Sequence, residues 1–557
     1  MSDLFTATTA AEVEEALARG EDIEGIKVLL ETEGEVDYID DDDDEDDEED
    51  DKERDTPLLS ACRRGALQVV DCLINHGADV NHATRSSLFV PIQLAAEKGH
   101  ASIVERLFRA GADINCSESG QPEGNYTPLT LASRQGHVDV VDCLLSLGTD
   151  LEKRNEDGET ALMWASENGM IDIVDRLLAA GSNVNAVDND DETALTRAVL
   201  SGHLPIVDRL VVHGADFNHQ NKTESNALMI AAQNDRVDVL DRLLSLGCDV
   251  NLQDNQGTTA LILVSENGHT ELVSRLIAAG CDLNLQDNQG TTPLIAASQN
   301  GYTDIMDLLI SAGCDVNLQD SQGTTPLIFA CLRGRIEIID RLIAAGCDLN
   351  LQFLRGTTAL MWACEKGRIE IASRLIDAGC DLNLQDVKKW TALIWAIHRG
   401  LNEIAHRLIV SGCDLSCHDN PRLTILTRAS QYGLIEIVDH LIGAGFGFTL
   451  ENNLIDLALH HACSEGHIIV AERLLRAGCN VNAQDENGWT ALMWACYNEK
   501  IDVVRLLLDH GADPLLQNKD AKRAIDFSAR SPKIQILLNG LILLSFHHHH
   551  HHHHHVP

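Results

Sequence analysis

The sequence predicts an all-α protein, a solenoid of stacked helical repeats, and three observations lead to this fold class. The same pattern returns every 33 residues, thirteen times between positions 127 and 523. Most of these returns begin with a threonine that opens a Thr-Ala-Leu or Thr-Pro-Leu triplet. The helices predicted within one period are shorter than the roughly 12–15 residues that a lone helix needs in water, so only stacking on neighbours can stabilise them.

We call the recurring residue the cap position. Threonine holds it at Thr127, Thr160, Thr193, Thr259, Thr292, Thr325, Thr358, Thr391, Thr424 and Thr490, and other residues hold it at Asn226, Leu457 and Arg523. Upstream, Thr56 and Val90 keep the same phase in two earlier repeats.

One period, residues 254–286, shows why each element is predicted. Asp254 opens a tight turn, because its side chain can hydrogen-bond its own backbone. Thr259 begins a first helix, where its hydroxyl can cap unpaired backbone amides. This helix stops at Gly268 and a second helix stops at Gly280, since glycine is favoured just past a helix end. The repeating unit is therefore turn, first helix, turn, second helix.

These residues resemble the ankyrin repeat family. The resemblance covers nearly the whole chain and includes Gly-Ala-Asp-Val-Asn at 77–81 and Gly-His at 99–100, 136–137, 202–203, 268–269 and 466–467. It implies a concave surface, formed by turn tips and first helices, that binds folded proteins or extended peptides. It also implies that turn asparagines such as Asn251, Asn284, Asn317 and Asn350 are similar to sites hydroxylated in the family. One departure is that Ile, Met, Thr or Leu stands where the family often has His, two residues after Pro.

We divide the chain into five segments. A degenerate N-terminal capping repeat is expected in residues 1–39 and an acidic, disordered insert in residues 40–55. The repeat array occupies residues 56–517, a C-terminal capping repeat residues 518–546, and a polyhistidine tail residues 547–557. About sixteen modules form one array, and solenoid ends need such polar caps.

Two places depart from the regular period. Four additional residues within 117–125 predict an enlarged turn, and Phe446 stands where other repeats have Cys or Ala. A phenylalanine in a slot built for a small residue overpacks it unless the stack opens. The second place is therefore either a tolerated, drifted repeat or a bend used for binding.

The formal net charge is −45, and residues 40–51 are twelve consecutive Asp or Glu. Such a block repels itself, which predicts a solvated, disordered loop. No apolar run reaches the length of a membrane span, and no basic region followed by an apolar core opens the chain. We expect a monomer of the cytoplasm or nucleus, without membrane insertion, whose negative field disfavours nucleic acid.

Twelve of the sixteen cysteines follow the repeat at two phases. Seven replace the alanine of Gly-Ala-Asp, and five lie six residues after the cap position. Equivalent positions in adjacent repeats are about 8–10 Å apart, beyond the roughly 7 Å between Cα atoms that a disulfide spans. We expect small buried thiols in a reducing compartment.

The histidines give no sign of catalysis. His100, His137, His203, His269 and His467 share one repeat phase and are assigned to the scaffold. The chain has no HExxH, paired CxxC, phosphate-binding loop or nucleophile elbow. We therefore predict no enzyme, no cofactor and no metal site. The nine-histidine run 547–555 is either an expression tag or a natural low-complexity tail, and a metal-buffering role is a further alternative.

The tryptophans fall at two phases. Four lie four residues after the cap position, where we expect packing between repeats: Trp164, Trp362, Trp395 and Trp494. Trp390 and Trp489 lie one residue before the cap position, in the projecting turn, as does Tyr126. Because aromatic anchors often dominate interface energy, these three and Tyr497 are candidate contact residues. The alternative is packing against the neighbouring turn.

Residues 333–407 carry eleven Lys or Arg against nine Asp or Glu, a local balance of +2 in a chain at −45. Spacing by one repeat places several of these cations side by side in a stripe. The candidate binding residues of this stripe are Arg333, Arg335, Arg355, Lys366, Arg368, Lys388, Lys389 and Arg399. The alternative is a solvated face of mixed charge.

We predict a non-catalytic interaction scaffold or adaptor that binds an acidic protein or acidic peptide on the concave surface around residues 325–424. The chain's own run 40–51 is one potential occupant, competing intramolecularly at high effective concentration. An alternative function is an acidic chaperone of basic proteins or histones, in which the run 40–51 is the active element.

Overall fold

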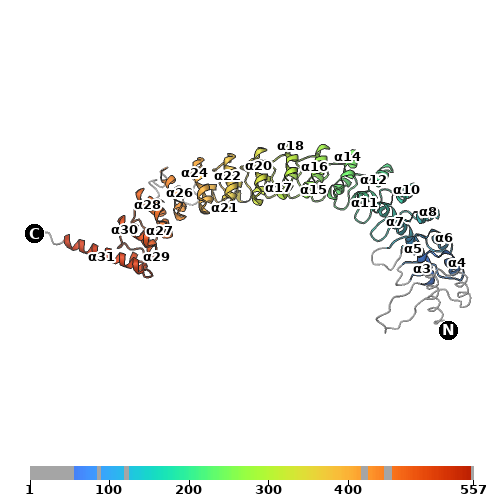
Figure 1. Cartoon of the computed structure of the whole chain (residues 1–557), viewed down its shortest axis with the longest axis horizontal. Coiled ribbons are helices and arrows are strands. Elements are labelled where there is room, and N and C mark those ends of the chain that lie inside the picture. The colour runs from blue at the N-terminus through green and yellow to red at the C-terminus, as the bar shows by residue number, and fades with distance from the viewer. Residues whose placement is uncertain (1–55, 84–88, 118–124, 415–424, 444–453, 553–557) are drawn as a thin grey trace, which may run out of the picture. The chain divides into compact units, whose positions relative to one another are not determined.

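A computed structural model describes residues 56–83, 89–117, 125–414, 425–443 and 454–552 (Figure 1). The chain divides into two compact units, Met1–Asn288 and Gln289–Pro557. The predicted capping repeat 1–39, the acidic insert 40–55, most of the enlarged turn and Phe446 lie outside the described residues. Within those residues the regular structure is helical, with no strand and one isolated β-bridge between Phe353 and Thr357.

In the first unit, first helices of seven or eight residues alternate with second helices of nine. The first helices are α3 (Pro57–Arg64), α5 (Pro91–Lys98), α7 (Pro128–Gln135), α9 (Ala161–Glu167), α11 (Ala194–Ser201), α13 (Ala227–Gln233) and α15 (Ala260–Asn267). The second helices are α4 (Leu67–Asn75), α6 (Ala101–Arg109), α8 (Val138–Ser146), α10 (Ile171–Ala179), α12 (Leu204–Val212), α14 (Val237–Ser245) and α16 (Thr270–Ala278).

The second unit repeats this alternation and ends in a longer helix. Its first helices are α17 (Pro293–Asn300), α19 (Pro326–Arg333), α21 (Ala359–Lys366), α23 (Ala392–His398), α25 (Ile425–Gln431), α27 (Leu454–Glu465) and α29 (Ala491–Tyr497). Its second helices are α18 (Thr303–Ser311), α20 (Ile336–Ala344), α22 (Ile369–Asp377), α24 (Asn402–Val410), α26 (Ile435–Gly443), α28 (Ile468–Arg476) and α30 (Ile501–Asp509). Two 3₁₀ helices, η1 (Leu354–Gly356) and η2 (Ala524–Phe527), and α31 (Pro532–His552) complete the unit.

The cap pattern explains where the first helices begin and end. The Thr259 hydroxyl accepts a hydrogen bond from the backbone N–H of Ile262 at 3.2 Å, at the start of α15. Gly268 ends that helix with a φ of 78°, a left-handed conformation that costs glycine little. Hydrogen bonds of the first kind are also made by Thr56, Thr127, Thr160, Thr193, Asn226, Thr292, Thr325, Thr358, Thr391 and Thr490.

Within each unit the helices form two layers. First helices contact the first helices of neighbouring repeats, second helices contact second helices, and the two helices of a pair contact each other. Figure 1 shows the second helices gathered on one side of the first helices in each unit. Val264 of α15 and Leu272 and Leu276 of α16 are fully buried, which places the apolar core between the layers.

Polar side chains of the turns connect consecutive repeats. The Asn317 Oδ1 accepts a hydrogen bond from the Asp348 N–H at 2.7 Å, and Asn350 accepts one from Asp381 at the same distance. These bonds satisfy backbone amides of the irregular exit segments, which lack helical partners. The turn asparagines are therefore part of the stack, and their hydroxylation stays a prediction.

Ion pairs join the second helices, and we call them the second-helix ladder. Each arginine pairs with an aspartate of the preceding repeat, as Arg209 does with Asp175 at 2.8 Å. The other pairs are Arg106–Asp71, Arg176–Asp142, Arg242–Asp208, Arg275–Asp241, Arg341–Asp307, Arg374–Asp340, Arg407–Asp377 and Arg473–Asp439. Between α24 and α26 two histidines take these positions, and the rings of His406 and His440 lie 4.9 Å apart.

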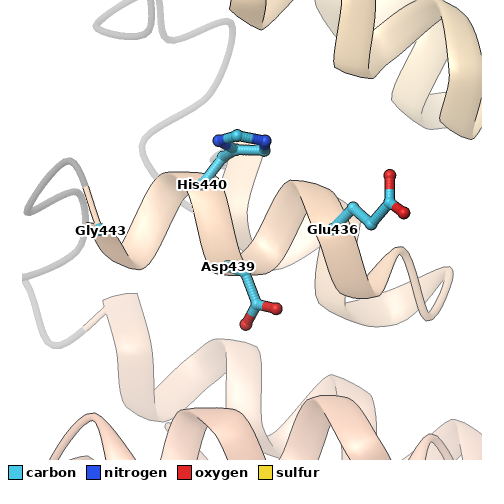
Figure 2. Close-up of a pocket in the computed structure, with 4 residues that line it drawn as sticks. All are labelled: Glu436, Asp439, His440 and Gly443. Atoms are coloured by element: carbon cyan, nitrogen blue, oxygen red, sulfur yellow. The ribbon is translucent and has the colours of Figure 1, made fainter.

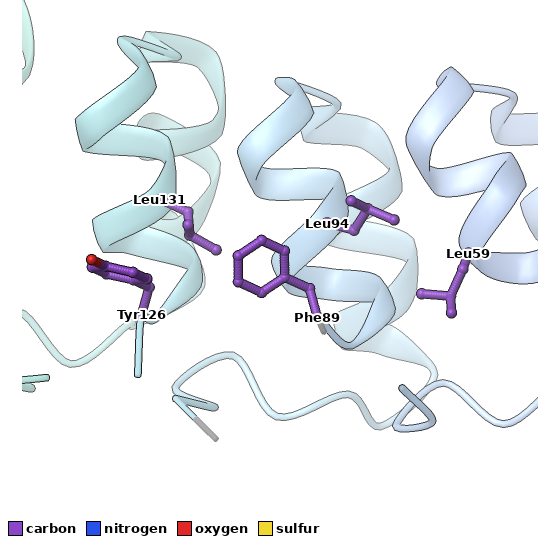
Figure 3. Close-up of a cluster of buried hydrophobic side chains, with 5 residues drawn as sticks. All are labelled: Leu59, Phe89, Leu94, Tyr126 and Leu131. Atoms are coloured by element: carbon purple, nitrogen blue, oxygen red, sulfur yellow. The ribbon is translucent and has the colours of Figure 1, made fainter. Parts of the chain in front are cut away.

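A buried cluster in the first unit shows how residues before the cap position pack. Leu59, Phe89, Leu94, Tyr126 and Leu131 form this cluster, and a tryptophan of the next repeat packs against it. Figure 3 shows Phe89 beside Leu94 on α5 and Tyr126 beside Leu131 on α7. In both repeats the residue before the cap position thus lies against the residue four after it.

The predicted all-α repeat solenoid is confirmed, and two details differ from expectation. The position three residues after the cap position holds Gln93 and His460 in two repeats, not only Ile, Met, Thr or Leu. Also, α31 continues through His552, past the predicted boundary at residue 546. No helix in the described parts of the chain is long and apolar enough to cross a membrane.

Candidate protein-binding surface

Three rows of exposed basic side chains lie in the second unit. Arg333 and Lys366 are the last residues of α19 and α21, and Arg399 follows the last residue of α23. Since these first helices contact one another in order, the three cations form one row. A second row stands at the start of the second helices (Arg335 and Arg368), and a third lies in the turns (Arg355, Lys388 and Lys389).

Ion pairing separates the eleven cations of residues 333–407 into two groups. Arg341, Arg374 and Arg407 of the second helices pair with aspartates of the preceding repeat. The other eight form no ion pair with any residue in the described part of the chain, and all eight are exposed. They are the eight residues that the sequence predicts for the binding stripe. Their charge is not already neutralised by the protein.

Arg335 also has a packing role that the sequence analysis missed. In an earlier repeat His137 holds this position, and its Nε2 lies 2.7 Å from the Glu97 carbonyl oxygen. The Arg335 guanidinium lies over Gly301, where an added Cβ would collide with it. The predicted scaffold role of the histidines is confirmed where such carbonyl contacts occur, at His100, His137, His203 and His467.

Trp390 packs on the start of α23, in what we call the first aromatic triad: Trp390, Trp395 and His398. The Trp390 ring centroid lies 4.6 Å from that of Trp395 and 5.1 Å from that of His398. Asp386 holds the arrangement, because its Oδ2 accepts the indole N–H of Trp395 at 3.1 Å and its Oδ1 accepts two backbone N–H groups. Trp390 stays half-buried, and the Lys388 ammonium lies 5.8 Å from its ring centroid.

The same arrangement recurs three repeats later, in the second aromatic triad: Trp489, Trp494 and Tyr497. Trp489 lies 4.3 Å from Trp494 and 5.6 Å from Tyr497 between ring centroids. Phe527 of the next repeat stacks on Trp489 at 4.4 Å. Trp489 is therefore packed against rings of two repeats, whereas Tyr497 is 59% exposed and open to a partner.

The structure corrects the prediction for Tyr126. Its side chain is only 8% exposed, its ring lies 6.0 Å from that of Trp164, and the Arg134 guanidinium carbon is 4.7 Å from its centroid. So little surface cannot anchor a partner. The alternative interpretation was packing against the neighbouring turn; the ring is indeed packed, but its ring partner Trp164 lies on the next first helix, α9.

One packing rule explains the three aromatic residues before cap positions. The residue four after the cap position lies one helical turn into the first helix. This places it beneath the projecting turn that precedes the helix, so a ring one residue before the cap position covers it. An aromatic residue before a cap position is therefore less exposed than its place in a projecting turn predicts. Leu354 and Val387 were not among the predicted site residues, and they are 57% and 70% exposed in the turns that carry the third cation row. In the sequence, these two residues can be recognised because each is apolar at a position that is polar in other turns.

The buried thiols are unreactive at neutral pH. None of the cysteines in the described ranges forms a disulfide. Burial raises the pKa of Cys331 to about 12 and that of Cys248 to about 11. Such a thiol is protonated at neutral pH, which makes it a poor nucleophile and a poor metal ligand. The same described residues contain no group of three or more His, Cys, Asp or Glu placed to hold a metal ion.

An open hollow lies against α26 and is lined by Glu436, Asp439, His440 and Gly443 (Figure 2). Figure 2 shows Asp439 and His440 leaving the helix in different directions, so their polar atoms do not converge. Asp439 already pairs with Arg473 in the second-helix ladder. The hollow therefore offers no arrangement for catalysis or metal binding.

Comparison with known proteins identifies the repeats. A family model described as ankyrin repeats, in three copies, matches overlapping segments that together run from residue 15 to residue 518. The curated proteins include no match to this chain.

Proposed function

Since the chain belongs to the ankyrin repeat family, whose repeats are protein–protein interaction domains, we propose that it is a non-catalytic scaffold or adaptor. Its partner is an acidic protein or acidic peptide, bound by the turn tips and first-helix ends of residues 325–424. We further propose that the protein acts as a monomer, in the cytoplasm or nucleus.

The eight unpaired cations between Arg333 and Arg399 carry this proposal. A chain with a net charge of −45 repels acidic molecules at long range, so a local surplus of exposed cations is a specific feature. Complementary charge favours association and register with an acidic partner and disfavours basic competitors. The half-buried Trp390, beside the third row, adds apolar contact area.

Charge reversal of the first row tests the proposal. The probe is a fluorescein-labelled peptide of alternating Glu and Ser, and fluorescence anisotropy measures its affinity for the full chain. The triple variant Arg333→Glu, Lys366→Glu, Arg399→Glu should bind at least about tenfold more weakly, and added salt should weaken binding to the unmodified chain.

A matched variant controls for the global field. Arg505→Glu, Lys519→Glu, Lys522→Glu makes the same change in charge at exposed positions of the same unit, and it should leave the affinity within about twofold. Equal losses in both variants would show a general field effect. No binding to the unmodified chain would also contradict the proposal.

Self-competition by residues 40–51 has its own test. If this acidic run occupies the basic rows, deleting it should raise the affinity for the labelled peptide, most strongly at low salt. Unchanged affinity at every salt concentration would rule out the competition.

The unbroken acidic run also supports the second candidate function, a chaperone of basic proteins or histones. Residues 1–60 alone should then retain a histone in a pull-down. If only the chain with its repeat array retains partners, the adaptor function stands and the chaperone function fails.

A further inference from the structure

Two neighbouring turn tips differ in composition from the rest of the array. Leu354 and Val387 lie four residues before their cap positions. The described turns elsewhere have polar residues there: Glu156, Asn189, Lys222, Asn255, Asn288, Ser321, Glu486 and Lys519. Leu354 is 57% exposed and Val387 is 70% exposed. Exposed apolar side chains on adjacent tips offer apolar surface that a partner can bury.

The two tips form one surface. The Val387 N–H donates a hydrogen bond to the Arg355 carbonyl oxygen at 2.9 Å. Gly356 also approaches the next tip so closely that an added Cβ would lie 3.3 Å from the Asp386 Cα. We call Leu354, Arg355, Val387, Lys388 and Lys389 the fingertip patch.

Positive charge surrounds the apolar pair. Arg355, Lys388 and Lys389 are exposed, and each forms no ion pair with a described residue. The one carboxylate in these two tips belongs to Asp386, which is 9% exposed and hydrogen-bonded through both oxygens. This carboxylate therefore faces the interior and not the solvent.

We propose that the fingertip patch binds an extended acidic segment of a partner protein that carries two aliphatic side chains three residues apart. The aliphatic side chains rest on Leu354 and Val387, and the flanking carboxylates meet the three cations. Neighbouring repeats are about 10 Å apart. A polyproline II segment advances about 3.1 Å per residue with three residues per turn, so side chains three apart lie on one face at about that distance. This assignment rests on the proposed function and adds the spacing and apolar character of the partner.

Three labelled peptides of equal length and charge test the assignment by fluorescence anisotropy on the full chain. One has two leucines three residues apart among Glu and Ser, one has them two residues apart, and one has Ser in place of both. The first peptide should bind at least about tenfold more tightly than the serine peptide. Leu354→Ser with Val387→Ser should abolish that difference, and serine fits the turn because Ser321 holds the equivalent position.

A matched double variant, Val212→Ser with Val410→Ser, removes exposed apolar surface from second-helix ends, where the two valines are 79% and 66% exposed. It should keep the full preference for the first peptide. The assignment is overturned if the leucine and serine peptides bind alike, if the two leucine spacings bind alike, or if the matched variant loses the preference equally. Charge reversal at Arg333, Lys366 and Arg399 should weaken all three peptides together. Failure of the proposed function is distinguishable, because the unmodified chain would then bind none of the three peptides.

Discussion

At the scale of single residues, side chains first satisfy the backbone of their own repeat. Asp386 accepts two turn amides and one indole N–H, and the Thr259 hydroxyl accepts an amide at the start of α15. These groups have fixed partners and little freedom to bind anything else. The residues available to a partner are those that do not bond the backbone in this way. Lys388 and Tyr497 are examples, because both side chains are exposed.

His460 also bonds the backbone, and its side chain can take up a proton. Its Nε2 lies 2.8 Å from the Ala483 carbonyl oxygen, while its Nδ1 is buried without a partner among the described residues. Burial lowers the pKa of His460 below its ordinary value, although Asp485 and Asp456 oppose the shift. As the pH falls below about 6.5, the unfolded chain therefore takes up a proton before the folded chain does.

We expect the stability of this repeat to fall as the pH is lowered from about 6.5 towards the lowered pKa of His460. Gln93 holds the equivalent position in another repeat, where its amide donates to the Cys116 carbonyl, the counterpart of Ala483, at 3.5 Å and to the Tyr126 carbonyl at 2.8 Å. His460→Gln should therefore keep an N–H donor at this place without the titration. Hydrogen exchange of α27 and α29 at about pH 7 and about pH 5, corrected for intrinsic rates, measures the effect. The same acid sensitivity in both proteins would contradict it.

At the scale of elements, an aspartate nine residues before a tryptophan anchors a turn to a first helix. Asp386 with Trp395 and Asp485 with Trp494 make this bond at 3.1 and 3.2 Å. The second helices are joined differently, by the aspartate–arginine ladder. That ladder is interrupted where His406 faces His440.

Restoring the ladder at this place should stabilise it modestly. The double variant His406→Asp, His440→Arg places an ion pair between α24 and α26 like that of Arg209 with Asp175. An exposed pair contributes about 0.2–1 kcal/mol and weakens with salt. Hydrogen exchange of α24 and α26 in the double and both single variants gives the coupling energy.

A coupling energy near zero at low salt would show that the two helices are not placed for an ion pair. A coupling that is unchanged by salt would show that packing, and not charge, stabilises the double variant.

At the scale of the whole molecule, contacts are made between neighbouring repeats. First helices contact the next first helices and second helices the next second helices, as the pairs α5 with α7 and α6 with α8 show. Stability is then a sum of local terms, and unfolding need not be two-state. A mutation should therefore act on its own repeat and the adjacent ones.

Leu177→Ala tests this locality. Leu177 of α10 is fully buried, and removing its side chain should cost about 2–5 kcal/mol. Hydrogen exchange should accelerate in α8, α10 and α12 and stay unchanged in α19, α21 and α23. Binding of the acidic peptides should also be unchanged. Loss of protection across α19–α23 would show long-range cooperativity instead.

The sequence by itself determined the repeat architecture. A 33-residue period, threonine caps and glycine ends are local features, and each acts through hydrogen bonds and backbone angles within a few residues. The sequence also identified the basic rows, because a fixed period converts sequence phase into position on the stack. The apolar character of Leu354 and Val387 was equally visible there, although it was not recognised.

Only the tertiary structure decided which of these side chains are available. It showed that Tyr126 is covered by its neighbours, that Arg335 lies over Gly301, and that Arg341 is neutralised by Asp307. Exposure and ion pairing depend on the adjacent repeat, about 33 residues away in the chain but in direct contact in the stack. A repeat phase gives a residue's position, and the packing of the next repeat determines whether a partner can reach it.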